Sequence, residues 1–130
     1  MQKVQLLSPP DGHVVETLTD PRILATVAGV VAGNTAEKAL FKGARQLFGV
    51  AAPAAGGTVK YFAAKEDGSA DTSKESVTYR TNRNVARAAG VIGAIAAIEY
   101  SNNGVAQYTL LGSAAVWFSH IVHDLVPALR

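Results

Sequence analysis

The sequence predicts a mainly helical α+β protein that carries one β-hairpin and ends in an antiparallel helical hairpin rich in Ala and Gly. Two apolar segments at residues 85–100 and 105–126 flank the short polar turn SNNG, and such a turn joins antiparallel neighbours. Two runs rich in Thr, Val, Tyr and Phe precede these segments, and this composition is typical of strands. The chain of 130 residues has the length of a single domain.

The N-terminal part is expected to form an extended arm followed by one or two helices. Residues 1–19 contain a Pro-Pro-Asp-Gly turn signal and no lasting periodicity, so we expect an arm with at most a short strand. Helices are expected over residues 20–50. Asp20 as N-cap and Pro21 at the first helical position predict where they begin. The first helix is expected to stop at Gly33-Asn34, and a second to start at Thr35, since Asn34 and Glu37 resemble a capping box.

The second of these predicted helices is amphipathic. At 100° per residue, Lys38, Lys42 and Arg45 fall on one side and apolar residues on the other. The pattern favours a surface helix that covers a core. It also fits a helix that turns its basic side toward the headgroups of an anionic lipid surface.

The middle of the chain, residues 58–81, is expected to form the β-hairpin. A breaker-rich connector, AAPAAGG, precedes it. The segments TVKYFAAK and ESVTYRTN are the predicted strands, and the polar segment between them is the predicted loop. Two strands alone are only marginally stable, so this hairpin needs support from a helix or a neighbouring subunit.

The helical hairpin at residues 84–126 contains many small residues where core helices commonly use Leu and Phe. Small residues recur at every fourth position, which aligns them along one face of a helix. Gly costs about 1 kcal/mol against Ala in a helix interior, so such ridges indicate close packing of backbones. The predicted helix-packing residues are Ala25, Gly29 and Gly33 in the first helix, and Ala86, Gly90, Ala94, Ala89, Gly93 and Ala97 in the hairpin.

These features favour a membrane-embedded protein. Charged residues make up 17% of the chain, less than the usual quarter, and the segment at 105–126 is long enough to span a bilayer. The hairpin turn carries no charge while basic residues stand at both ends of the hairpin, as the positive-inside rule expects. The predicted membrane-flanking residues are Arg80, Arg83, Arg87 and Arg130. The N-terminal residues do not resemble a cleavable signal peptide.

No catalytic, metal or cofactor site is predicted. The chain has no Cys, which excludes disulfides and thiolate chemistry. His120, His123 and Asp124 share the last helix, but a zinc site needs three or four ligands and no other cluster supplies the rest. Ser119 cannot form a triad with them, because neighbours in one helix diverge. We expect no enzymatic activity, no cofactor and no small-molecule substrate.

Two functional hypotheses follow from these patterns. The first is a small non-enzymatic structural or assembly protein embedded in a membrane, such as a component of a virion membrane or coat, which packs against copies of itself or other subunits. The alternative is a soluble α+β coat or scaffold subunit that forms homo-oligomers. In that case the hairpin could contact nucleic acid through Lys60, Arg80 and Arg83, although the acidic residues at its tip argue against this. A weaker third alternative is an enzyme or cofactor-binding subunit that uses His120 and His123.

Overall fold

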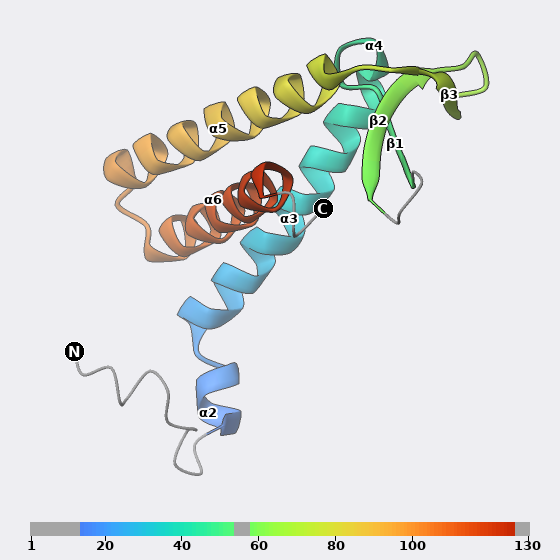
Figure 1. The fold of residues 1–130 in the computed structure, drawn as a ribbon. Coiled ribbons are helices and arrows are strands. Elements are labelled where there is room, and N and C mark those ends of the chain that lie inside the picture. The colour runs from blue at the N-terminus through green and yellow to red at the C-terminus, as the bar shows by residue number, and fades with distance from the viewer. Residues whose placement is uncertain (1–13, 54–57, 127–130) are drawn as a thin grey trace.

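Three long helices carry the fold, and a small antiparallel sheet covers one end of them (Figure 1). The computed structural model describes residues 14–53 and 58–126. Helix α6 (Gly104–Leu125) packs against both α3 (Pro21–Gly43) and α5 (Val77–Tyr100). The sheet lies where α3 ends and α5 begins. The predicted α+β class, mostly helical with a C-terminal helical hairpin, is confirmed.

Helix α3 begins where the sequence predicts and then runs through the predicted stop. Asp20 caps it by accepting the backbone N–H of Arg22 at 2.8 Å. The predicted break at Gly33 is wrong, because α3 continues to Gly43. The Gly33 carbonyl accepts the indole N–H of Trp117 at 2.9 Å. This contact with α6 offsets the low helix propensity of glycine.

Two short helices flank α3. Helix α2 (Val14–Leu18) stands where the sequence predicts an arm or a short strand, and residues 1–13 of that arm lie outside the described residues. Helix α4 (Arg45–Phe48) is followed by Gly49, which has a φ of 62°. A Cβ at Gly49 would also come within 2.6 Å of the Tyr79 ring, so this entry into the sheet requires glycine.

The sheet has three antiparallel strands in the order β1 (Val50–Pro53), β2 (Val59–Ala64) and β3 (Ala70–Glu75). The register of β1 and β2 places Val50 opposite Phe62. Strand β1 lies in the predicted connector, and β3 occupies much of the predicted polar loop. The sheet therefore has one strand more than the predicted hairpin, and the loop between β2 and β3 is shorter than predicted.

Helix α5 begins inside the predicted second strand, so that strand is wrong. Ser76 has an extended backbone and accepts the N–H of Thr78 at 3.2 Å, which caps the helix. Val, Thr and Tyr at residues 77–79 favour a strand by composition. In the helix, however, the same segment places Arg80 against the Val59 carbonyl and Arg83 over the Tyr61 ring, both in β2. Tertiary contacts therefore override the local propensity.

Aromatic side chains fill the junction of helices and sheet, while small side chains fill the contacts between the long helices. The Phe41 and Phe48 rings have centroids 4.7 Å apart. The buried apolar residues of the described part are Ala25, Phe41, Phe48, Tyr61, Phe62, Ala94 and Ala114. This is a small core, and large apolar side chains remain exposed on α3, α5 and α6.

Among the helices of residues 14–53 and 58–126, none combines the length and the apolar character needed to cross a membrane. The predicted membrane-spanning helix at residues 105–126 is therefore not supported. Polar residues along α6, including Gln107, Ser113 and His120, interrupt its apolar character.

Candidate functional site

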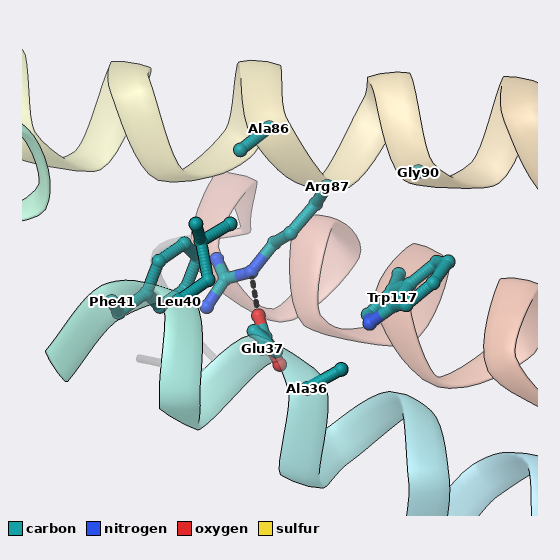
Figure 2. A pocket seen from close by; sticks show the side chains of 8 residues that line it. All are labelled: Ala36, Glu37, Leu40, Phe41, Ala86, Arg87, Gly90 and Trp117. Atoms are coloured by element: carbon teal, nitrogen blue, oxygen red, sulfur yellow. Dashed lines mark hydrogen bonds and ion pairs between the residues drawn. The ribbon is translucent and has the colours of Figure 1, made fainter. Parts of the chain in front are cut away.

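A buried network of charged side chains joins the three long helices. Glu37 of α3 and Arg87 of α5 are only 7% and 8% exposed. The Arg87 Nε–H donates to Oε1 of Glu37, and Figure 2 shows this pair between the two helices. The other oxygen, Oε2, lies 2.5 Å from Nδ1 of His120 on α6. Both oxygens of Glu37 therefore have a partner.

Asp124 of α6 extends the network to the sheet. Its Oδ2 accepts a hydrogen bond from Arg87 Nη1 at 2.7 Å, and its two oxygens lie 3.1 and 3.0 Å from the Tyr61 hydroxyl, which donates to them. Arg87 Nη1 also donates to Asn84 at 2.9 Å. The network thus links α3, α5, α6 and β2. Its charges are paired and hydrogen-bonded, as buried charges must be.

The surroundings of this network shift two pKa values. Burial raises the pKa of the Tyr61 hydroxyl, and the negative charge of Asp124 adds to the effect. Burial works to lower the pKa of Arg87, but hydrogen bonds and charges from Glu37 and Asp124 outweigh it and raise that pKa. Arg87 therefore stays charged, and Tyr61 stays neutral and donates its proton to Asp124.

Replacing Tyr61 with Phe is expected to lower the free energy of unfolding by about 1–3 kcal/mol, because Asp124 loses a buried donor. The folded chain also holds the Tyr61 proton more tightly than the unfolded chain does. This contribution to stability is full below the ordinary tyrosine pKa of about 10 and is lost as the pH rises through the folded value. Between about pH 8 and about pH 11, the free energy of unfolding measured with urea should therefore fall more for the parent than for Tyr61→Phe. Equal losses would contradict this prediction.

Arg83 is a second buried cation, only 9% exposed, and within the described residues it has no carboxylate partner. Its Nε and Nη2 donate to the carbonyls of Phe48 at 2.7 Å and Gly49 at 3.0 Å. Its guanidinium lies 4.5 Å from the centroid of the Phe41 ring and 4.3 Å from that of Tyr61. Burial lowers the pKa of Arg83. Carbonyls and aromatic faces thus offset part of the cost of burying this charge, while no anion is paired with it within the described residues.

Two hollows share Glu37 and Arg87 in their walls. The first is an apolar groove of about 180 Å³ between α3 and α5, with Trp117 of α6 between them (Figure 2). The second is a polar hollow of about 320 Å³. It is lined by residues that include Tyr61, Arg83, His120, His123 and Asp124.

The polar side chains of α6 connect this helix to the other long helices. His120 and Asp124 each bind a partner from another helix. Ser119 donates to the carbonyl of Val116 at 2.8 Å, so its hydroxyl is engaged within its own helix. Across residues 14–53 and 58–126, no group of three or more His, Asp and Glu side chains could hold a metal ion.

No protein-family model, curated protein or solved structure matches this chain. Its function has to be argued from its own residues.

The small-residue ridge of the first predicted helix lies against α6. A Cβ on Gly29 would overlap the carbonyl oxygen of Thr109, and one on Gly33 would come within 2.9 Å of the Ser113 Cα. Ser113 Oγ donates to the Gly29 carbonyl at 2.8 Å. Ala25, the third residue of this ridge, is buried as well. The closest backbone approach therefore joins α3 and α6.

The two ridges of the helical hairpin differ in their surroundings. A Cβ on Gly90 would come within 2.9 Å of the Trp117 ring, and Ala94 is buried. Nothing lies within 4 Å of a Cβ built on Gly93. The expected packing of this second ridge within the chain is therefore corrected, because α5 turns the neighbouring ridge, which contains Gly90, toward α6. The exposed residues of this ridge are Ala89, Gly93 and Ala97, whereas Ala86 lines the apolar groove with Gly90.

The basic residues predicted to flank a membrane are engaged inside the chain. Arg83 and Arg87 are buried, and Arg80 Nη2 donates to the carbonyl of Val59 at 3.1 Å. Arg130 lies outside the described residues. The predicted flanking role is thus corrected for Arg83 and Arg87, since their helix turns them toward α3 and the sheet.

The predicted nucleic-acid face is corrected for a similar reason. Lys60 Nζ lies 3.6 Å from Oε1 of Glu75. The Arg80 guanidinium lies over the Tyr61 ring, 5.2 Å from its centroid, and Arg83 is buried. These three cations do not form one exposed basic surface.

The outer faces of α5 and α6 carry apolar stripes. The α6 stripe is spaced four and three residues apart, which is the 3.5-residue repeat of a coiled-coil seam. Its members are Leu111, Ala115, Phe118, Val122 and Leu125, all exposed. On α5, Val85, Ala89, Ile92 and Ala96 are exposed at the same spacing. Neither stripe contains a charged residue, although Arg83 and Arg87 lie on the inward face of α5.

Proposed function

We propose that this chain is a small structural subunit that assembles with copies of itself through the outer apolar faces of α5 and α6. The observation that carries the proposal is the α6 stripe from Leu111 to Leu125. It is exposed along its length while α3 and α5 cover the other faces of the helix. Exposed apolar patches of this kind mark interaction sites.

A second copy suits this stripe because the flanking positions are uncharged. Flanking residues of one copy would lie beside those of the other, so charges of one sign there would repel one another. Of the flanking residues, Ser119 and Val126 are exposed and Ile121 is half-buried, while Gly112 and Ala114 are buried within the chain. Repulsion between copies is therefore absent along the stripe itself.

The α6 stripe extends over most of its helix. Helix α6 has 22 residues, a length of about 33 Å at 1.5 Å per residue. The exposed small residues Gly93 and Ala97 of α5 would allow a helix of another copy to approach closely. A shell or coat, including that of a virion, is a setting for such a subunit.

A second candidate is attachment to a lipid surface by the same faces. Helix α5 has charged residues on its inward face and apolar residues outward, the reverse of a helix that faces water. Retention in the membrane fraction after alkaline washing would support this candidate. Release as a defined oligomer would favour self-assembly alone.

Phe118→Gln is expected to weaken the assembly, because Phe118 is the largest side chain of the stripe and is 58% exposed in the single chain. Losing its burial should raise the concentration for half dissociation roughly tenfold or more. Sedimentation velocity over a concentration series measures this shift. Leu47→Gln is the matched control, because Leu47 is 59% exposed on α4, away from both stripes. A parent chain that remains monomeric, or equal effects of the two substitutions, would contradict the proposal.

A further inference from the structure

Four basic side chains gather around one hollow beside the C-terminal part of α3, and no acidic residue lines it. The hollow measures about 270 Å³ and is bounded by α3, α4, the start of β1 and the turn between β2 and β3. Its basic residues are Lys38, Lys42, Arg45 and Arg83. These carry four formal positive charges in a chain whose net charge is +2. Positive charge is therefore concentrated at this place.

Three of these cations are available to a ligand. Within residues 14–53 and 58–126, the side chains of Lys38, Lys42 and Arg45 form no ion pair and no hydrogen bond. Lys38 and Lys42 are exposed and lie one helical turn apart, so both can reach the same bound group. Arg45 is half-buried, and its guanidinium lies beside the backbone of Gly68.

The fourth cation, Arg83, is an independent sign that an anion belongs here. It is nine-tenths buried, and none of the carboxylates in the described segments pairs with it. Its Nε and Nη2 bind carbonyls, whereas Nη1 has no hydrogen-bond partner among the described residues. A buried charge without a counterion is costly. An anion in the adjoining hollow would reduce that cost.

We propose that this hollow binds a phosphate group. Lysine and arginine are the usual ligands of phosphate, which accepts several charge-assisted hydrogen bonds at once. The proposal goes beyond the assembly proposed above, since this site lies beside α3 and the sheet and uses none of the stripe residues. The phosphate can belong to a free phosphorylated molecule or to a lipid headgroup.

Calorimetric titration with pyrophosphate at low salt tests the site. The parent chain should bind, and the double variant Lys38→Ala/Lys42→Ala should bind roughly tenfold or more weakly, because it loses two charged ligands. Lys60→Ala/Lys74→Ala is the charge-matched control and should keep the parent affinity. All four lysines are on the surface, with side-chain exposures of 44% for Lys60 and 72% for Lys74, so neither double variant should disturb folding.

The outcomes separate the possible sources of binding. Equal weakening by both double variants would show a response to overall charge and overturn the proposal, as would a parent that does not bind pyrophosphate. Binding to a short oligonucleotide but not to pyrophosphate would overturn it too.

Binding to phosphatidic acid vesicles that depends on Lys38 and Lys42 would assign the phosphate to a lipid headgroup. Pyrophosphate binding without vesicle binding would assign it to a free ligand. Sedimentation velocity of the same variants shows whether they still assemble, so phosphate binding and assembly are tested separately.

Discussion

Replacing Arg87 with Ala is expected to lower the free energy of unfolding by about 3–5 kcal/mol, a large part of the stability of a small domain. The substitution leaves Glu37 and Asp124 in a buried site without the cation that pairs with both. Their side chains are only 6% and 10% exposed, so water cannot replace the lost partner at little cost. Urea unfolding followed by circular dichroism measures the change.

Arg22→Ala is the control for this experiment. Arg22 also pairs with a carboxylate, that of Asp20 at 2.7 Å, but its side chain is 66% exposed. Exposed pairs contribute little to stability, so this variant should unfold close to the parent. In the double variant Glu37→Ala/Arg87→Ala the loss should be smaller than the sum of the two single losses, since the partners share one interaction. Additive losses, or an Arg87→Ala variant as stable as Arg22→Ala, would show that the buried pair contributes little to the free energy of unfolding.

The parts of the fold that the sequence predicted are those encoded within a few residues. Asp20 and Pro21 mark the start of α3, and the SNNG turn places Asn103 where it caps α6 by accepting the N–H of Val105 at 2.9 Å. A cap acts on the residues next to it, so its effect can be read from a short stretch. Ser76 is of a residue type that favours an N-cap, but the Val, Thr and Tyr that follow it favour a strand.

Other features depend on residues far apart in the chain. Gly33 lies inside α3, where its carbonyl binds the indole of Trp117, 84 positions away in the chain. The pairing of Glu37 with Arg87 joins residues 50 positions apart, so neither segment alone indicates burial. One signal was available: Arg83 and Arg87 lie four residues apart on the same helical face as Gly90 and Ala94. A charged residue on a predicted packing face can be expected to find a buried partner.

The contact between α3 and α6 has no space for a side chain where their backbones meet. Gly29 lies against the carbonyl of Thr109, and Gly112 of α6 lies against the carbonyl of Thr26 in the same way. Each glycine thus occupies a position where a methyl group would overlap the backbone of the other helix. By contrast, a Cβ on Gly93 of α5 would have nothing within 4 Å.

Gly29→Ala and Gly93→Ala are therefore expected to change stability in opposite directions. The first should lower the free energy of unfolding by about 1–3 kcal/mol or more, because α3 and α6 must separate and strain the hydrogen bond from Ser113 to the Gly29 carbonyl. The second should raise it by about 0.5–1 kcal/mol, because Ala favours an exposed helix interior over Gly. Urea unfolding at protein concentrations low enough to keep the chain monomeric separates this effect from assembly. If Gly29→Ala were stabilising like Gly93→Ala, the two backbones could not be in direct contact at this position.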